Sequence, residues 1–144
     1  MNPSSSGKVF SFPAFIQLIR PTNLLIMAFA QLMTAYFLIE TTHEGLPILE
    51  DPNLYVLILA TVLVAASGYM INDYYDVKID YINKPDEVVV GKNIKRRTVM
   101  LLHTFFNFAA ISMGILLHPK VGAINFVAAF YYGSTVIHSS GFLL

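Results

Sequence analysis

Long apolar runs separated by short polar stretches dominate this chain. A helix that crosses a bilayer needs about 20 mostly apolar residues, and four runs approach that length. We expect spans at about 22–39, 53–71 and 98–117, and a fourth from 121 that fades after 132. Arg20-Pro21 precedes the first run, and proline is well placed in a first helical turn. The pattern predicts an all-α fold, a polytopic transmembrane helix bundle.

Composition supports a membrane protein. Of 144 residues, 56% are hydrophobic and 12% are charged, and the mean hydropathy is +0.61. A soluble domain has about 25% charged residues. The absence of cysteine excludes disulfides and thiolate metal sites. We expect residues 1–12 to be a disordered cytoplasmic lead rather than a signal peptide, because the apolar stretch that follows is too long.

The basic residues predict the orientation. Eight Lys and Arg residues precede the first run or lie between the second and third runs, whereas only Lys120 falls on the other side. The positive-inside rule then places the N-terminus and the loop at 81–97 in the cytoplasm of a bacterial or archaeal cell. The loop cluster of Lys92, Lys95, Arg96 and Arg97 has two readings: it clamps phosphate oxygens, or it anchors the chain at anionic lipid head groups.

The candidate chemistry lies at the end of the second run, in Asn72, Asp73, Asp76 and Asp80. With Asn72 set at zero on a helix, the three aspartates fall near ~100°, ~40° and ~80°, so all four share one arc. Carboxylates crowded together repel one another unless cations hold them. Hard oxygen ligands suit Mg²⁺, which takes substrate phosphates as further ligands. Ionisable groups at a membrane edge are costly, and function is their default explanation.

These residues also carry a family resemblance. The stretch from Asn72 to Asp80, followed by Lys84-Pro85, reads N-D-x-x-D-x-x-x-D and then K-P. It resembles the first aspartate-rich motif of the UbiA-type intramembrane prenyltransferases. Arg20-Pro21-Thr22-Asn23 resembles the R-P-x-N entry to the first helix of that family. The likeness covers residues 13–130.

The resemblance implies a helix bundle of about nine spans around a large cavity. In that family, two aspartate motifs hold Mg²⁺, which binds the diphosphate of an isoprenyl donor, and the prenyl group passes to an acceptor. The implied roles are catalytic for Asp73 and Asp76, metal-binding for Asp73, Asp76 and Asp80, and substrate-binding for Asn72, Asn23, Lys78 and Lys84. The expected partners are a prenyl diphosphate, an aromatic or lipid acceptor and the bilayer, with no nucleic acid.

The acceptor is left open between two classes. An aromatic quinone precursor is the general choice in the family. However, residues 83–92 lack the Arg-Pro that often follows K-P, and Glu87 stands where an Arg is common. In this the loop looks more like the branch that alkylates a glycerol-phosphate ether lipid.

The far end of the chain departs from the family. About four spans are present, and no second aspartate motif follows them. Read one base out of register, with permitted codons, the tail from Tyr132 encodes W-L-Y-S-N-S-F-K-R-L-P, which resembles the end of helix four in the family. We therefore expect residues 13–132 to be the N-terminal part of a prenyltransferase domain and 133–144 to be a frameshifted tail. We also expect this chain to lack transferase activity.

A second functional class remains open, a cation transporter or channel fragment with the three aspartates as ion ligands. Transporter sites lie near the midplane of the membrane, whereas this cluster is expected at the cytoplasmic end. Other polar residues within the runs predict hydrogen bonds between helices rather than ligand sites. These are Gln31 and the pair His103 and Asn107, four residues apart on one face.

Overall fold

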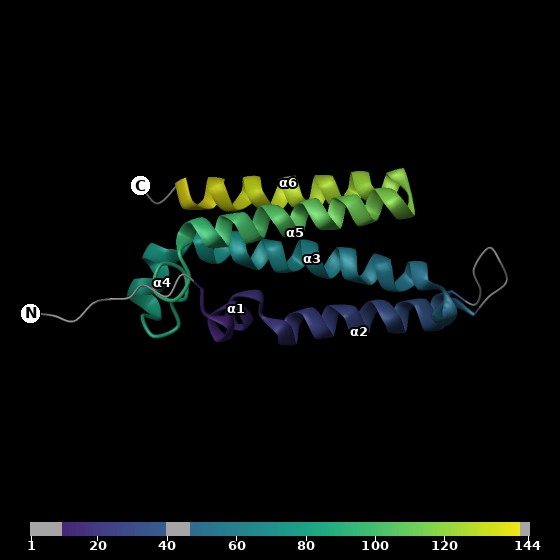
Figure 1. The fold of residues 1–144 in the computed structure, drawn as a ribbon, viewed down its shortest axis with the longest axis horizontal. Coiled ribbons are helices and arrows are strands. Elements are labelled where there is room, and N and C mark those ends of the chain that lie inside the picture. The colour runs from purple at the N-terminus through teal and green to yellow at the C-terminus, as the bar shows by residue number, and fades with distance from the viewer. Residues whose placement is uncertain (1–9, 40–46, 142–144) are drawn as a thin grey trace, which may run out of the picture.

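The computed structural model describes residues 10–39 and 47–141, with side chains as far as Ser134 (Figure 1). The elements in chain order are α1 (Phe12–Ile19), α2 (Pro21–Leu38), the 3₁₀ turn η1 (Ile48–Glu50), α3 (Pro52–Tyr75), α4 (Val77–Asn83), α5 (Arg96–Leu117) and α6 (Pro119–Gly141). No strand occurs among the described residues, where one isolated bridge joins Val90 and Ile94. The predicted all-α helix bundle is confirmed.

The long helices match three of the four predicted spans. Among the described residues, α2, α3 and α5 are long and apolar enough to cross a membrane. Helix α6 packs against α5 and α3 at the place of the fourth run, and it continues as helix to Gly141, past the predicted fading point at Tyr132. Of the predicted tail, residues 142–144 lie outside the described part. Pro21, Pro52 and Pro119 each open a helix, where the N–H that proline lacks has no helical partner.

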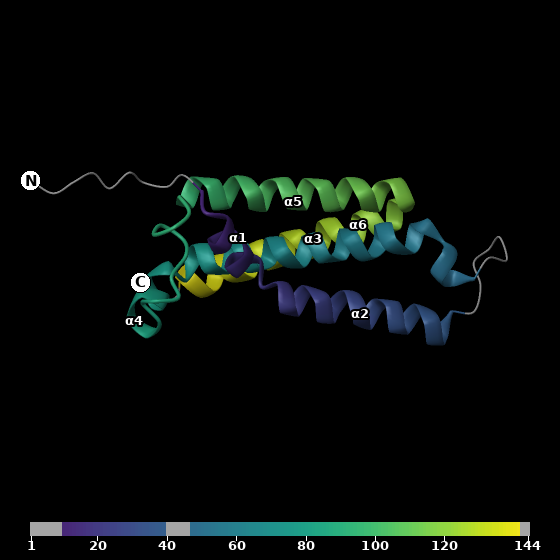
Figure 2. The same ribbon diagram turned by 60° about the horizontal axis from the view of Figure 1, so that its bottom comes forward.

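Helix α3 is the centre of the bundle. It contacts every other helix of the described part, and α5 and α6 cover one side of it while α1 and α2 cover another (Figure 1); Figure 2 shows the same bundle turned by 60°. Its fully buried positions include the small residues Ala60, Ala66 and Ser67. Small side chains let helix backbones approach closely, which favours helix packing within a membrane. The helix that delivers the acidic residues is therefore also the one held most firmly.

Polar side chains join α3 to its neighbours. His103 Nδ1 donates to the Ser67 carbonyl at 2.9 Å, and its Nε2 accepts from the Asn107 amide at 3.2 Å. The Ser67 hydroxyl reaches Asn107 Oδ1 at 2.7 Å, and Thr61 donates to Gln31 Oε1 at 2.8 Å. The predicted hydrogen bonds between helices are confirmed. Each such bond within a membrane contributes about 0.6 kcal/mol.

Helices α5 and α6 form a tight antiparallel hairpin. A Cβ added to Gly122 would lie 2.9 Å from the backbone nitrogen of Ile115, and one added to Gly114 would lie 3.0 Å from the Gly122 Cα. The buried Asn125 donates to the Ala110 carbonyl at 3.0 Å and so leaves no polar atom unpaired in this contact. Glycine at both positions lets the two backbones touch.

One end of the bundle carries a layer that the sequence did not predict. Residues 84–95 fold back over the helices instead of forming an open loop. Gly91 adopts φ 86°, and its N–H donates to the Ile94 carbonyl at 2.7 Å, which turns the chain inward. The buried cluster beneath comprises Ala14, Leu18, Met70, Val89, Val90, Ile94 and Val99. This apolar plug fixes α1 and the basic loop against α3.

Helix α1 is the second unpredicted element. It begins at Phe12, at the end of the expected disordered lead, and Pro13 stands in its first turn. Ala14 and Leu18 face the plug, while Phe15 meets Phe106 of α5 edge-on with ring centroids 6.3 Å apart. Residues 1–9 of the expected lead lie outside the described part of the chain.

The hairpin yields a prediction with a matched control in the same helix. We expect Gly122→Ala to lower the free energy of unfolding by about 1–3 kcal/mol, because the added methyl overpacks against α5. Gly133→Ala meets open space and should stabilise α6 by up to about 1 kcal/mol through helix propensity. Thermal unfolding of the two variants in detergent measures both effects. If both substitutions changed the free energy of unfolding equally, the close approach of α5 and α6 at Gly122 would be contradicted.

Candidate functional site

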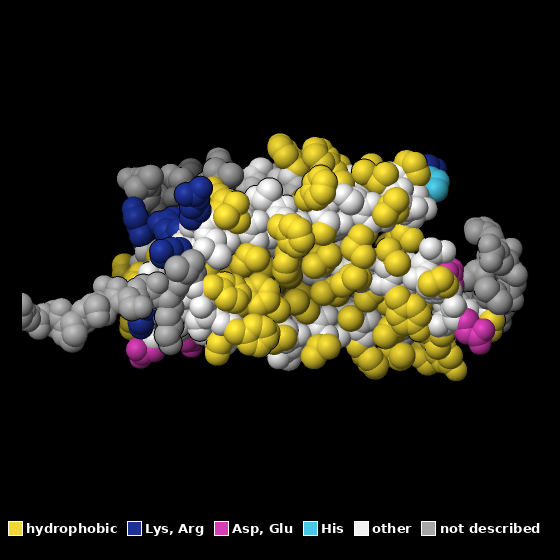
Figure 3. Space-filling view, in the orientation of Figure 1, with side chains coloured by type: hydrophobic (Ala, Val, Ile, Leu, Met, Phe, Trp, Pro, Cys, Tyr) yellow, Lys and Arg dark blue, Asp and Glu magenta, His cyan; other side chains and the backbone are white. Residues whose placement is uncertain are grey.

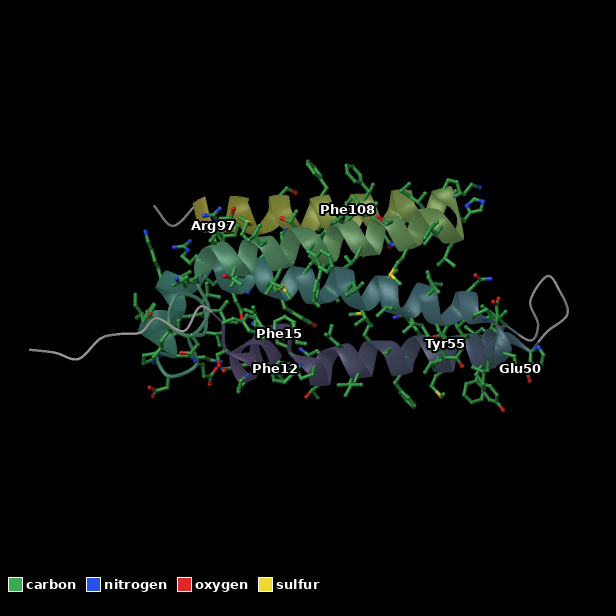
Figure 4. All side chains as sticks on the ribbon, viewed as in Figure 1. Phe12, Phe15, Glu50, Tyr55, Arg97 and Phe108 are labelled. Carbon is green, nitrogen blue, oxygen red and sulfur yellow. The ribbon has the colours of Figure 1, made fainter. Side chains whose placement is uncertain are left out.

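Charged side chains gather at the ends of the bundle, with a hydrophobic band between them (Figure 3). Most of the Lys and Arg side chains visible in this view lie at the end that carries α1 and α4. Figure 4 places Arg97 at this end and Glu50 at the other. The basic loop and the aspartate cluster therefore share one end, as the sequence predicted.

The aspartates lie across a break between two helices. The prediction of one continuous helix from Asn72 to Asp80 is wrong at Asp76, which has φ −80° and ψ 0° and separates α3 from α4. Helical hydrogen bonds nevertheless bridge the break, from Asp76 N–H to the Asn72 carbonyl at 3.0 Å and from Asp80 N–H to the Asp76 carbonyl at 2.8 Å. The i, i+4 spacing, and with it the shared face, is retained.

Asp73 forms the one strong ion pair of the site. Its Oδ1 lies 2.7 Å from a guanidinium nitrogen of Arg20, 53 positions earlier in the chain. The Asp73 side chain is 18% exposed and that of Arg20 is 45% exposed. The pair ties the junction of α1 and α2 to the end of α3.

Arg20 has an unusual backbone. It is the only non-glycine residue of the described part with positive φ, at φ 52° and ψ 63°, in the left-handed region. This conformation costs a residue with a side chain roughly 1–2 kcal/mol. Its guanidinium also lies 5.2 Å from the centroid of the Tyr69 ring. Contacts to an anion and to an aromatic face therefore hold a strained residue at the site.

Asp76 carries a less favourable charge. Burial raises the pKa of the Asp76 carboxyl, and the charge on Asp80 raises it further. A hydrogen bond from Asn72 Nδ2 to Asp76 Oδ2, 3.0 Å long, and the charge of Arg20 act in the opposite direction. The site thus concentrates more negative charge than its own partners neutralise, which favours binding of a cation.

The residues present fit Mg²⁺ in their chemistry. Carboxylate and amide oxygens are its preferred protein ligands. Among the described residues, however, no three acidic or histidine side chains converge closely enough to hold an ion. Arg20 engages Asp73, and Asn72 engages Asp76. A metal would have to displace these protein partners or be completed by other ligands.

Two cavities meet at Arg20. The first, of about 270 Å³, is mostly apolar and lies between α2, α3 and α6; its lining is Arg20, Met27, Ala65, Gly68, Tyr69, Asn72 and Tyr132. The second, of about 320 Å³, is polar and lies between α1, α3, α4 and the folded loop; its lining is Gln17, Arg20, Asp73, Asp80, Lys84, Glu87 and Val89. Arg20 therefore stands between an apolar space at the level of the helices and a charged space at their end.

Of the predicted substrate-binding residues Asn23, Lys78 and Lys84, only Lys84 lines one of these cavities. Lys84 lines the polar cavity, where it pairs with Glu87 at 3.5 Å. Lys78 and Asn23 are exposed, and neither lines either cavity. Of the basic cluster, Arg96 is fixed over the Tyr74 ring with its guanidinium carbon 4.5 Å from the centroid.

Sequence reasoning missed two residues of the site, Gln17 and Arg20. Gln17 donates to the Glu87 carbonyl at 3.2 Å and joins α1 to the folded loop. The sequence pattern gives Arg20 a place in the entry to the first span and in the charge asymmetry, but no role in the site. One signal could have identified Arg20: it is a cation directly before the first span, at the membrane edge where the acidic cluster is also expected. Charges at a membrane edge are normally paired, so an aspartate partner for Arg20 could have been predicted.

The charge at Asp76 gives a stability prediction. We expect Asp76→Asn to raise the free energy of unfolding of the metal-free chain at pH 7 by less than about 1 kcal/mol after solvent screening, and the melting temperature should rise with it. A carboxyl with a raised pKa stabilises the fold at low pH and loses that contribution as pH rises through its folded pKa. The difference from wild type should therefore vanish in acid. Asp86→Asn, at an exposed position outside both cavities, is the control and should change little at either pH.

Comparisons with known proteins identify relatives of this chain. Three relatives are named digeranylgeranylglyceryl phosphate synthase. The protein of Sulfolobus acidocaldarius is 32% identical over 120 residues, covering 81% of this chain and 38% of the relative. That of Saccharolobus solfataricus is 32% identical and covers 83% and 40%, and that of Methanosarcina barkeri is 26% identical and covers 88% and 45%. The chain thus spans less than half the length of these relatives.

No solved structure matches the chain significantly. A sequence model of the UbiA prenyltransferase family matches residues 24–135, well over half of the chain and including both the acidic stretch and most of α6. The chain belongs to the UbiA prenyltransferase family.

Proposed function

We propose that this chain is part of a Mg²⁺-dependent enzyme that transfers an isoprenyl group from an allylic prenyl diphosphate to an acceptor. The observation that carries the proposal is the position of the acidic cluster: Asn72 lines an apolar cavity, and Asp73 and Asp80 line the charged cavity that adjoins it at Arg20. A prenyl diphosphate has the same polarity, an apolar tail joined to a strongly anionic head.

The proposed reaction requires stabilisation of the departing diphosphate on one side of the breaking bond and of the allylic cation on the other. The bond between C1 of the prenyl group and the diphosphate oxygen breaks, a new bond forms between C1 and the acceptor oxygen, and the hydroxyl proton and inorganic diphosphate leave. When bound, Mg²⁺ supplies a Lewis acid that neutralises charge on the departing diphosphate. Asp73, Asp76 and Asp80 would hold it, with Asn72 orienting Asp76 through the hydrogen bond described above.

The cationic side chains complete the head-group site in this proposal. Lys84 and Arg20 line the polar cavity and offer N–H donors to phosphate oxygens. Lys78 and Asn23 are proposed as outer contacts that come into play when a ligand is bound. The apolar cavity would exclude water from the allylic cation, and the Tyr69 ring in its lining would stabilise positive charge through the aromatic face. Tyr74 is less suited to this role, because it lines neither cavity.

For the acceptor we propose a glycerol-phosphate ether lipid rather than an aromatic ring. The relatives named above are synthases of digeranylgeranylglyceryl phosphate, a glyceryl phosphate with two geranylgeranyl groups. The missing Arg-Pro after Lys84-Pro85 agrees with that branch. The acceptor hydroxyl would then be an alcohol on glycerol, and the new bond an ether.

A cation transporter remains less well supported. Its ligands would lie near the membrane midplane, whereas Asp73, Asp76 and Asp80 lie at the end of α3 and on α4, beside the basic loop. The expectation that residues 1–144 show no turnover by themselves stays a prediction, so that ligand binding is the direct test of the site.

The metal test uses Mn²⁺, which carboxylate sites accept in place of Mg²⁺ and which electron paramagnetic resonance detects. We expect the purified chain to bind Mn²⁺ at least about tenfold more tightly when geranylgeranyl diphosphate is present, since metal and diphosphate share ligands. Asp76→Ala and Asp80→Ala should abolish this gain, and the control Asp86→Ala should keep it. If the Mn²⁺ affinity is the same with and without the prenyl diphosphate, the transporter is favoured.

The orientation has its own test, helped by the absence of native cysteine. We expect a single cysteine from Lys92→Cys, in the basic loop, to resist a membrane-impermeant maleimide in intact cells and to react after permeabilisation. The matched variant Asn53→Cys, at the start of α3 and the other end of the bundle, should react in intact cells. The reverse pattern would place the acidic cluster outside the cytoplasm and contradict the proposal.

A further inference from the structure

We propose that Arg20 is an exchangeable cation: it occupies Asp73 in the metal-free chain, is displaced when a divalent metal binds, and then moves to the phosphate of the ligand. This inference rests on the proposed function in one respect, the metal at Asp73. It adds a step, a change of partner by a side chain of the protein itself.

The contacts of Arg20 support displacement. Its guanidinium is 2.7 Å from Asp73 Oδ1, so it covers an oxygen that a metal would need. Two positive charges cannot share one carboxylate oxygen at this distance without strong repulsion. A metal on Asp73 Oδ1 and this ion pair would therefore compete, and each would weaken the other.

The surroundings give the displaced side chain somewhere to go. Arg20 is 45% exposed, whereas Asp73 is 18% exposed, so the cation can move while the carboxylate stays in place. The guanidinium already lies 5.2 Å from the Tyr69 ring centroid, which offers an intermediate position. The polar cavity of about 320 Å³ adjoins it, with Gln17 and Lys84 as further donors for a phosphate.

The backbone makes the movement local. Arg20 lies in the left-handed conformation between α1 and α2, and its N–H is bonded to the Gln17 carbonyl at 3.3 Å. The buried Ala14 and Leu18 hold α1 in the plug. Only the side chain is free to change partner. From the fixed Cα it can reach either Asp73 or the neighbouring polar cavity.

The charge balance couples the exchange to ligand binding. Two cationic side chains, Arg20 and Lys84, face three carboxylates, Asp73, Asp80 and Glu87, in the polar cavity. This excess of negative charge repels a bare phosphate. A divalent cation reverses the sign of the balance and at the same time frees Arg20, which then has a charge-assisted hydrogen bond to offer. The metal and the phosphate should therefore bind cooperatively.

Removal of the cation should move the two affinities in opposite directions. We expect Arg20→Gln to bind Mn²⁺ alone about fivefold more tightly, since a half-exposed ion pair no longer competes. The same variant should bind inorganic diphosphate about tenfold more weakly in saturating Mn²⁺. Arg20→Lys should lie closer to wild type in both. Arg97→Gln removes the same charge from an exposed position on α5 and should leave both affinities within about twofold.

A measurement on the wild-type chain covers the case in which Arg20→Gln does not fold. Phenylglyoxal modifies accessible guanidinium groups, and mass spectrometry reports each arginine separately. We expect Mn²⁺ alone to raise the modification of Arg20 relative to Arg97, and Mn²⁺ with diphosphate to lower it again. If Mn²⁺ binds and the modification of Arg20 does not change, the proposed exchange is wrong.

The outcomes separate this inference from the proposed function. If wild type binds Mn²⁺ more tightly with prenyl diphosphate but Arg20→Gln shifts both affinities in one direction, the exchange is wrong and the metal site stands. If neither protein binds Mn²⁺ under any condition, both proposals are wrong. Opposite shifts, with Arg97→Gln unchanged, establish the exchange.

Discussion

The packing of α3 among the other helices is the contact on which the rest of this structure depends. An apolar helix whose last turn carries carboxylates must hold its charged end at the membrane edge. Small residues at Ala60, Ala66 and Ser67 let neighbouring helices approach, and the Ser67 backbone is bonded to His103 of α5. Because α3 cannot slide or rotate freely, the positions of Asp73 and of the α4 break follow from its packing.

The site itself is assembled by parts of the chain that are distant in sequence. Helix α1 and the loop at 84–95 are held by an apolar plug, and that plug brings Gln17, Arg20 and Lys84 around the acidic end of α3. The buried valines of the plug thus help to position the charged groups of the site. Arg20 connects the two cavities, and its strained backbone is consistent with a residue retained for its position rather than for local stability.

The metal-free site is not at an energetic optimum. Burial and the neighbouring Asp80 disfavour the charge on Asp76, and the described partners neutralise Asp73 but leave Asp80 without an ion pair. Such a cluster destabilises the metal-free fold, and if it holds a metal as proposed, stability and metal affinity would oppose one another. In the proposed reaction the same imbalance would favour a metal–diphosphate complex over either component alone.

The sequence by itself determined the fold class, the three apolar spans, the acidic cluster and the hydrogen bonds of Gln31, His103 and Asn107. These follow from periodicity and hydropathy, which act over one or a few helical turns. Tertiary structure alone decided the break at Asp76, the plug of Val89, Val90 and Ile94, and the pairing of Arg20 with Asp73. Each of these depends on contacts between residues tens of positions apart, and no local pattern records which distant partner a side chain will meet.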